Sequence, residues 1–276
     1  MIKFVNVSHS YNNGNESIEE SISNINLDIE DGDFIAIIGS NGSGKSTFAK
    51  HVNGLLLPSE GDVIIDNCNT KDKEHIWNIR KKVGMVFQNP DNQLVATTVE
   101  DDIAFGLENI GLNEKEMQER VKWALKQVDM LCFRSYEPHL LSGGQKQKIV
   151  IAGALAMRSS HLILDEPTSM LDPKGRKEVL EIVKKLNKEK NITIVYITHF
   201  MSEAVMFDKI VVFEKGKIVL TGSPKDIFLQ KNVLDDLKLE IPQITRFARL
   251  LNENGLDIPI NIIDEKEMLD KLCLLI

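Results

Sequence analysis

The sequence predicts an α/β protein with a parallel core sheet, an antiparallel edge sheet, a helical insertion and a small, mostly helical C-terminal part. Three observations support this class: continuous apolar runs, an alternating stretch near the N-terminus, and an apolar stripe at helical spacing in mid-chain. The length of 276 residues suits one large domain with an appendage, or two domains. Because 42% of the residues are apolar and 27% are charged, we expect a globular protein that is folded throughout.

The N-terminal stretches are predicted to be half-exposed strands. Residues 2–7 alternate apolar and polar side chains, a polar turn follows around residues 12–15, and residues 22–29 alternate again. We expect an antiparallel hairpin or a small sheet at the edge of the domain.

The core strands are predicted from runs that are apolar almost throughout, as in parallel strands buried on both faces. These runs cover residues 34–38, 162–164 and 192–197, and helical stretches separate them. They predict a parallel α/β core.

A helical insertion is expected at about residues 95–155. Asn113 is followed by Glu116 at the spacing of a capping box, which would open a helix here. After residue 222 the strand pattern stops, and Pro242 and Pro259 interrupt a mostly helical tail. We therefore expect one unit over residues 1–222 and a C-terminal unit over residues 223–276. The apolar stripe of the insertion consists of Val121, Ala124, Leu125 and Val128.

Composition excludes several classes of protein. No apolar run approaches the roughly 20 residues that span a bilayer, and the N-terminus lacks the layout of a signal peptide, so we expect the chain to stay in the cytoplasm. A net charge of -8 argues against a broad nucleic-acid surface, although one nucleotide needs only a few backbone N–H groups and a lysine. Cys68, Cys132 and Cys273 are too scattered for a C-x-x-C pair and are interpreted as packing residues.

A phosphate-binding loop, G-x-x-x-x-G-K-[ST], follows the first predicted core strand and precedes a helix. Its glycines let successive backbone N–H groups face phosphate, Lys45 is expected to reach the β- and γ-phosphates, and Ser46 to ligate magnesium. The nucleotide-binding stretch comprises Gly39, Ser40, Asn41, Gly42, Ser43, Gly44, Lys45 and Ser46, with Thr47 next.

Two acids, Asp165 and Glu166, end the predicted buried strand at residues 161–166. The carboxyl ends of parallel strands lie beside bound phosphates in such folds, so we expect Asp165 to hold Mg²⁺ through its water shell. Glu166 is expected to orient and deprotonate the attacking water. The local alternative is that the two acids cap the next helix.

The segment Leu141, Ser142, Gly143, Gly144 and Gln145 forms a second predicted anion-binding nest at a helix start. This pentapeptide and the phosphate-binding loop together resemble the ABC ATPases, over roughly residues 1–222. The resemblance implies an ATPase in which the signature of one cassette closes over the phosphate loop of a second. Two ATP molecules would thus lie in a head-to-tail dimer of cassettes.

Further positions match the ABC pattern in order. The resemblance implies that Tyr11 stacks on adenine, that Gln88 touches magnesium and water, and that His199 senses the γ-phosphate. It also implies that the loop ending at Asp172 contacts the second cassette. The local alternatives are packing for Tyr11, a structural histidine at residue 199, and a helix cap for Asp172.

A narrower resemblance is carried by residues 88–93 and 97–106, together with 141–157 and 165–173. These stretches are similar to the energy-coupling factor (ECF) and cobalt-importer (CbiO-type) ATPases, and most of all to the first of the paired ECF ATPases. The resemblance implies that a groove behind Gln88 accepts a coupling helix from a membrane subunit, with Leu94 and Val95 as contacts. The local alternative for residues 88–93 is a surface turn before a capped helix.

The C-terminal tail resembles the short domain that helps to hold two ECF ATPases together. The alternative is a helix that packs on its own cassette. Residues 71–74 and 80–82 are charged runs that we interpret as solvated faces.

Together these features predict an ATP-hydrolysing subunit that powers import of a vitamin or a transition-metal ion such as cobalt. We expect it at the cytoplasmic face of the cell membrane as a peripheral subunit, with a second ABC ATPase, identical or not, an integral membrane coupling subunit and a substrate-binding membrane subunit. ATP and Mg²⁺ are the expected cofactors, and no nucleic acid is expected. The alternatives are the ATPase of another transport system, an ABC protein that acts on nucleic acid, and a regulatory module without turnover.

Overall fold

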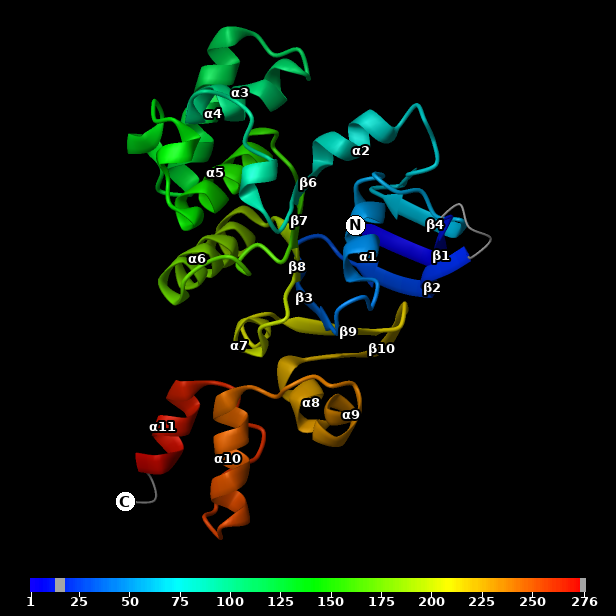
Figure 1. Ribbon diagram of the computed structural model, residues 1–276, viewed down its shortest axis with the longest axis vertical. Helices are drawn as coiled ribbons and strands as arrows, with labels where there is room; N and C mark the ends of the chain where they lie inside the picture. Colours follow the sequence, from blue (N-terminus) through cyan, green and yellow to red (C-terminus); the bar gives the residue numbers. More distant parts are fainter. Residues whose placement is uncertain (13–17, 274–276) are drawn as a thin grey trace.

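The computed structural model describes residues 1–12 and 18–273 (Figure 1). Most of the polar turn predicted around residues 12–15 lies outside the described residues. In Figure 1 the strands of the core sheet run through the centre, an antiparallel sheet lies to one side of them, and helices lie on the other side and below. The predicted fold class is confirmed.

A six-stranded sheet forms the core, in the order β10-β9-β3-β8-β7-β6. The five strands from β9 to β6 are parallel, and β10 pairs with β9 in the antiparallel sense. All residues of β3, β7 and β8 are buried, which explains why their sequences are apolar almost throughout. The strands are β3 (Phe34–Gly39), β6 (Val83–Val86), β7 (His161–Asp165), β8 (Thr193–Ile197), β9 (Lys209–Glu214) and β10 (Lys217–Gly222).

The predicted edge sheet is a separate antiparallel sheet of four strands, in the order β2-β1-β4-β5. Helix α1 (Lys45–Val52) joins it to the core sheet, because Phe48 stacks on Phe4 with ring centroids 4.3 Å apart and meets the edge of Phe213 at 5.4 Å. The strands are β1 (Ile2–Asn12), β2 (Ile18–Ile29), β4 (Glu60–Ile65) and β5 (Cys68–Asn69).

The helical insertion packs on the opposite side of the core sheet from α1. Its predicted apolar stripe is buried in the larger core cluster, so the helical periodicity is confirmed. The helices on this side are α3 (Val99–Glu108), α4 (Glu114–Gln127), α5 (Gly143–Ala156) and α6 (Pro173–Lys190). Helix α2 (Ile76–Lys82) precedes β6, the 3-10 turn η1 (Pro90–Asn92) lies between β6 and α3, and the turns η2 (Leu131–Phe133) and η3 (Pro138–Leu140) lie between α4 and α5.

The predicted capping box of α4 forms only in part. The Asn113 side chain accepts a hydrogen bond from the backbone N–H of Glu116 at 3.0 Å. The Glu116 carboxylate instead accepts from Arg120, one turn further along the helix, at 2.7 Å. An ion pair at this spacing competes with the return bond to the cap.

Over residues 223–273 the C-terminal part contains four helices, which follow the short helix after β8 and the last two strands of the core sheet. The first two pack on the core, since Phe228 and Leu234 belong to its main cluster. The last two share a small apolar cluster that includes Ala248 and Met268, and Pro242 lies at the start of the third helix as its N-cap. The elements are α7 (Met201–Ala204), which follows β8, and then α8 (Pro224–Leu229), α9 (Lys231–Asp236), α10 (Gln243–Glu253) and α11 (Glu265–Cys273).

The interpretation of all three cysteines as packing residues was wrong for two of them. Cys132 and Cys273 are exposed. Cys132 lies in the short turn η2, and Cys273 is the last residue of α11, so neither is covered by another element. Cys68 is partly buried and packs against the core of the antiparallel sheet.

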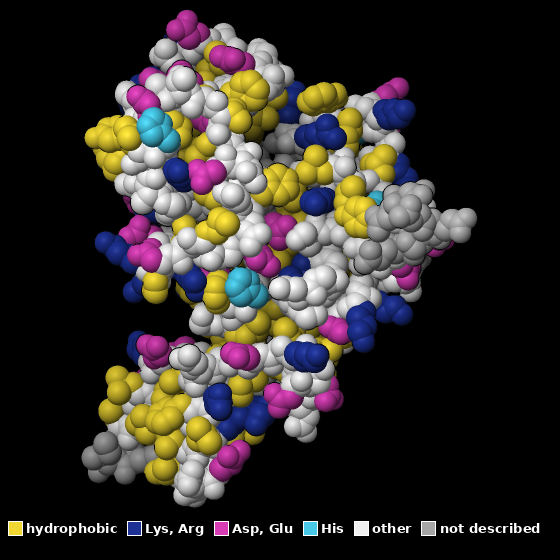
Figure 2. Space-filling view, in the orientation of Figure 1, with side chains coloured by type: hydrophobic (Ala, Val, Ile, Leu, Met, Phe, Trp, Pro, Cys, Tyr) yellow, Lys and Arg dark blue, Asp and Glu magenta, His cyan; other side chains and the backbone are white. Residues whose placement is uncertain are grey.

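The C-terminal helices carry part of the exposed apolar surface. Figure 2 shows hydrophobic side chains gathered on the part of the molecule formed by α10 and α11. Within the described residues, no helix combines the length and the apolar character that crossing a membrane would require. The exposed apolar residues of this region include Phe247, Leu250, Leu256, Ile260 and Leu269.

Candidate nucleotide-binding site

The parallel register brings the predicted site residues to one edge of the core sheet. Val86 of β6 pairs with Leu164 of β7, and Leu164 pairs with Tyr196 of β8. Residues two or three positions further along each strand therefore leave the sheet at the same edge. The phosphate-binding loop follows β3 at this edge as well, because β3 pairs with β8 in parallel.

The phosphate-binding loop connects β3 to α1 with glycines where other residues would be strained. Gly44 has φ +101°, and a Cβ atom there would lie 2.6 Å from the Ser21 carbonyl oxygen. Gly42 has φ +75° and faces open space. Gly44 is also the N-cap of α1 and offers no side chain to the first N–H groups of the helix. Those N–H groups remain free to bind an anion.

Lys45 lies in the wall of a cavity beside the phosphate-binding loop, called the phosphate cavity below. Its Nζ donates to the carbonyl oxygens of Gly39 at 2.8 Å and Ser40 at 2.7 Å, which holds the side chain along the loop. Burial lowers the pKa of Lys45, while the negative charges of Glu166 and Asp165 act in the opposite direction. The cavity measures about 340 Å³ and is lined by Ser21, Asn41, Gly42, Ser43, Gly44, Lys45, Ser46, Thr47, Gln88 and Glu166.

Asp165 provides a buried acceptor without a donor. Its Oδ1 atom has no hydrogen-bond partner within the described part of the chain. Burial raises the pKa of Asp165, whereas a hydrogen bond from Ser46 lowers it and the neighbouring Glu166 raises it further. An orphaned carboxylate oxygen next to a serine hydroxyl fits Mg²⁺, which prefers oxygen ligands.

The three predicted catalytic side chains meet at Glu166. Gln88 Nε2 donates to Glu166 Oε2 at 3.2 Å, and His199 Nδ1 lies 3.4 Å from the same oxygen. Glu166 adopts φ +50°, which is uncommon for a residue with a side chain, and its N–H donates to the Ile197 carbonyl at 3.0 Å. The carboxylate is therefore held between the ends of β6 and β8.

Tyr11 lies beside the phosphate-binding helix but does not line the phosphate cavity. Its hydroxyl is 3.3 Å from Thr47 Oγ1, and its ring meets the edge of His9 at 4.8 Å. Ser21 was missed in the sequence: its hydroxyl lies 2.7 Å from Thr47 Oγ1 and it lines the cavity. No motif marks Ser21, because only the position of β2 next to α1 brings it there.

The signature segment does not line the cavity formed by the phosphate-binding loop of the same chain. Ser142 is exposed and caps α5 in a complete capping box with Gln145, and Gly143 and Gly144 form its first turn. Asp172 likewise caps α6, because its side chain accepts a hydrogen bond from the Gly175 N–H at 2.9 Å. The helix cap that was the local alternative for Asp172 is therefore formed.

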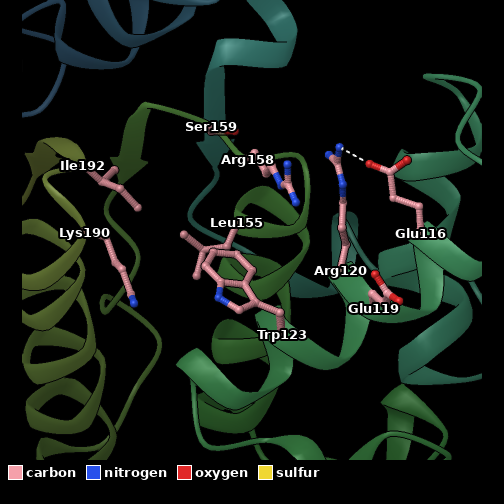
Figure 3. Close-up of a pocket in the computed structure, with 9 residues that line it drawn as sticks. All are labelled: Glu116, Glu119, Arg120, Trp123, Leu155, Arg158, Ser159, Lys190 and Ile192. Atoms are coloured by element: carbon pink, nitrogen blue, oxygen red, sulfur yellow. Dashed lines mark hydrogen bonds and ion pairs between the residues drawn. The ribbon is translucent and has the colours of Figure 1, made fainter.

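A separate hollow lies between α4, the C-terminal end of α5 and the C-terminal end of α6 (Figure 3). It measures about 510 Å³, and Trp123 of α4, Leu155 of α5 and Lys190 of α6 contribute to its walls. The ion pair between Glu116 and Arg120 lies on one side of it. This hollow shares no lining residue with the phosphate cavity.

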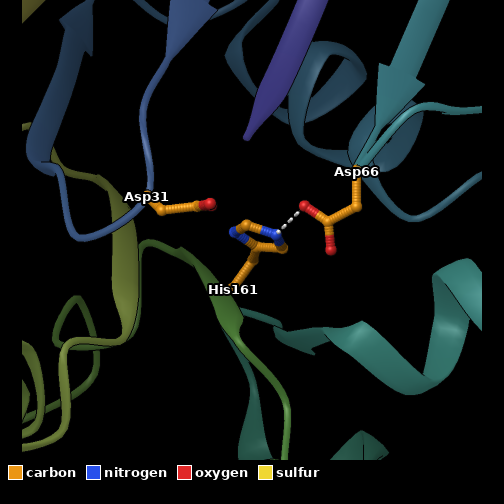
Figure 4. Close-up of side chains that lie close together, drawn as sticks. All are labelled: Asp31, Asp66 and His161. Carbon is orange, nitrogen blue, oxygen red and sulfur yellow. Dashed lines mark hydrogen bonds and ion pairs between the residues drawn. The ribbon is translucent and has the colours of Figure 1, made fainter.

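A cluster of Asp31, Asp66 and His161 lies at the opposite, amino-terminal end of β7 (Figure 4). Asp66 accepts from His161 Nε2 at 3.1 Å, and its oxygens also contact Lys82 at 2.9 Å and the Met1 amino group at 2.8 Å. Burial alone would raise the pKa of Asp66, but these donors hold that pKa below its usual range. The cations of the chain thus already neutralise this cluster.

The chain is similar to known proteins along nearly its full length. The sequence profile of the ABC transporter family matches residues 22–169. The energy-coupling factor transporter ATP-binding protein EcfA1 of Clostridium novyi is 52% identical over 273 residues, which cover 99% of this chain and 98% of the relative.

Solved structures share both fold and sequence with the chain. CbiO1 of Clostridium perfringens, described as part of the ABC transporter complex cbiONQ, has a TM-score of 0.77 and 36% identity over 91% of this chain and 98% of its own. The ATP-binding cassette MJ0796, solved as a dimer in a post-hydrolysis state with ADP and phosphate, has a TM-score of 0.74 and 33% identity over 81% of this chain and 99% of its own. The chain therefore belongs to the ABC transporter family and, within it, to the energy-coupling factor transporter ATP-binding proteins.

Proposed function

We propose that the chain is the ATP-binding and ATP-hydrolysing subunit of an ECF-type importer, which powers uptake of a vitamin or a transition-metal ion such as cobalt through separate membrane subunits. The observation that carries this proposal is the position of Glu166 at the rim of the phosphate cavity, between Gln88 and His199. A carboxylate placed there can act on a water molecule next to a bound γ-phosphate.

The phosphates of ATP are bound by the loop from Gly39 to Ser46 and by the N-terminus of α1. Lys45 is buried in the wall of the cavity and gives up its contacts with loop carbonyls in favour of the β- and γ-phosphates. Tyr11 is the adenine-stacking residue. It is partly exposed beside α1, and one face of its ring is enough for stacking.

Ser46 and Gln88 would hold Mg²⁺, and Asp165 would act through the water shell of the ion. When bound, the ion neutralises charge on the β- and γ-phosphates. The unpartnered Oδ1 of Asp165 supports this assignment.

Hydrolysis requires in-line attack of water on the γ-phosphorus. Glu166 orients that water and takes its proton, and Gln88 and His199 keep the Glu166 carboxylate in place. His199 also contacts the γ-phosphate and so links the state of the nucleotide to the end of β8. Positioning and charge stabilisation account for the rate enhancement, since no covalent intermediate is needed.

A second cassette completes each site. Ser142, Gly143, Gly144 and Gln145 form an exposed nest that its own phosphate cavity does not use. We assign this nest to the nucleotide of the partner cassette, and the loop that ends at Asp172 to the contact between cassettes. The partner is either a second copy or a related chain.

The membrane partner docks next to Gln88. Val95 lies on the segment that follows Gln88 and is 70% exposed. Leu94, beside it, is half-buried and packs against the core. A coupling helix that covers these side chains removes apolar surface from water. The chain then lies at the cytoplasmic face of the membrane as a peripheral subunit.

Residues 223–276 form the C-terminal unit, and we assign its apolar face to the second cassette. Phe247 and Leu250 project from α10 with exposures of 44% and 49%. A cavity of about 990 Å³ lies between residues 238–244, the phosphate-binding loop and the segment that begins at His199. The C-terminal unit therefore borders the side of the cassette on which the nucleotide binds.

Replacing Glu166→Gln is expected to reduce ATP turnover by about 10²-fold or more, because the general base is lost. Binding of ATP with magnesium should persist, and a closed dimer should accumulate. Turnover is measured by phosphate release and dimer formation by size-exclusion chromatography with ATP.

The adjacent Asp165→Asn serves as the contrasting variant. It should weaken ATP binding with magnesium while leaving binding in EDTA unchanged, because it removes charge at the ion. Wild-type turnover in Glu166→Gln would overturn its assignment, and undiminished magnesium dependence in Asp165→Asn would overturn that of Asp165.

A mixed dimer with Ser142→Arg on one chain tests the shared site. Photoreactive ATP should still label the phosphate loop of the variant chain but no longer that of the other chain. Ser135→Arg places the same side chain at another exposed serine of the insertion and should leave both labelled. Loss of label on the variant chain itself would contradict the sandwich arrangement.

The assembled transporter can be tested by affinity purification from detergent-solubilised membranes. An integral membrane subunit should co-purify with the chain, and the complex should hydrolyse ATP. Val95→Asp should lose this subunit yet retain ATP binding, whereas Val219→Asp, at an exposed valine of β10, should retain both. Equal recovery of the subunit with both variants would place the docking surface elsewhere.

The C-terminal contact is tested with a matched pair of leucines. Leu250→Glu in α10 should reduce the dimer fraction measured by analytical ultracentrifugation at least tenfold more than Leu57→Glu. The two leucines are 49% and 47% exposed, so the difference reports location rather than burial. Equal effects would indicate that α10 packs only on its own chain.

A further inference from the structure

We propose that Glu203 is a positioning residue for ATP hydrolysis, because it ties the end of β8, which carries His199, to the turn that follows Glu166. The proposal rests on the hydrolytic function proposed above. Glu203 belongs to α7 and touches none of the groups that line the phosphate cavity. It acts through the residues next to the catalytic ones.

The Glu203 carboxylate is buried and receives three hydroxyl groups. Glu203 is only 3% exposed. Thr168 Oγ1 donates to Oε1 at 2.7 Å, and Thr198 Oγ1 donates to Oε2 at 2.6 Å. Tyr196 donates to Oε2 at 3.3 Å, and its hydroxyl also lies 3.1 Å from Thr168 Oγ1. One acid thereby connects three side chains from two segments.

The charge environment indicates a specific role. Over residues 1–12 and 18–273, no nitrogen of Lys, Arg or His lies within 4.0 Å of the Glu203 carboxylate. A buried carboxylate without a cation is costly, and only the hydroxyl donors compensate for its lost hydration. An apolar side chain would fill the same space without that cost. The acid is therefore best explained by the two segments that its hydrogen bonds hold together.

The hydrogen-bonded residues flank the catalytic ones along the chain. Thr168 lies two residues after Glu166, and Thr198 directly precedes His199. Thr198 Oγ1 also accepts from the Phe200 N–H at 3.0 Å, so the peptide after His199 is fixed by the same group. The carboxylate thus sets the separation between the two segments that present Glu166 and His199.

A second contact holds the same two segments from another side. Arg176 of α6 donates through Nε to the Leu171 carbonyl at 2.9 Å, in the loop after Glu166. Its guanidinium carbon lies 3.8 Å from the centre of the Phe200 ring, next to His199. The His199 and Phe200 rings are 4.0 Å apart. The turn that carries His199 is therefore fixed on both sides.

The test compares two buried threonines in the complete transporter, Thr193 at the start of β8 and Thr198 directly after its end. Thr198→Val removes a bond to Glu203, whereas Thr193→Val alters the far end of the same strand. Each is 1% exposed, and each hydroxyl accepts one backbone N–H at 3.0 Å. We expect Thr198→Val to lower kcat at least about tenfold with KM for ATP unchanged, because misplaced catalytic groups slow the chemical step. Thr193→Val should keep the wild-type kcat.

Glu203→Gln provides the second variant, since it preserves volume but replaces one acceptor oxygen with a donor. It should reproduce the decrease in kcat. The double variant with Thr198→Val should lower kcat by less than the product of the two single fold decreases. Thermal unfolding and ATP binding are measured on every variant to separate positioning from loss of fold.

Equal kcat in Thr198→Val and Thr193→Val, or wild-type kcat in Glu203→Gln, would overturn the proposal while leaving ATP hydrolysis by the wild type intact. A wild-type complex that does not hydrolyse ATP would instead overturn the proposed function. If Thr198→Val does not fold, the kcat of Glu203→Gln alone decides.

Discussion

The parallel pairing of four strands is the constraint on which the site depends. Strands β3, β8, β7 and β6 are hydrogen-bonded side by side in one direction, so whatever follows each of them emerges at one edge. Gln88, Glu166 and His199 come from three strands that are far apart in the sequence and nevertheless meet at a single carboxylate oxygen. A shift of one residue in any pairing would turn one of these side chains away from the others.

The second constraint is the concentration of unpaired charge at that edge. Lys45 is buried against backbone carbonyls, and Oδ1 of Asp165 has no donor among the described residues. Each group is costly by itself, and both can be compensated by one anionic ligand with its metal ion. The site is therefore expected to gain stability when MgATP binds, since a ligand that binds only the folded chain stabilises it by mass action.

The sequence was sufficient for features that depend on local chemistry and insufficient for those that depend on tertiary contacts. Continuous apolar runs predicted β3, β7 and β8, and the loop that ends at Ser46 was predicted from its glycines and lysine. Strands β4 and β5 were not predicted, because β5 has only two residues and β4 begins with the polar stretch Glu60–Asp62 and is defined by its pairing with the distant β1. Ser21 and Glu203 were missed for a related reason: each acts through residues distant in sequence. Cys132 was misjudged, because sequence does not show which turns stay uncovered.

One chain by itself leaves its site open to water. His199 has a side chain that is 42% exposed, and Asn41, Gly42 and Gln88 are exposed as well. Phosphoryl transfer depends on fixed dipoles acting where bulk water is excluded, because water weakens each interaction and leaves the attacking molecule unoriented. In the arrangement proposed above, the exposed nest at Ser142 lines no part of its own cavity, and a second cassette covers that cavity instead. Hydrolysis in that arrangement depends on assembly, because separating the two cassettes would return bulk water to the site.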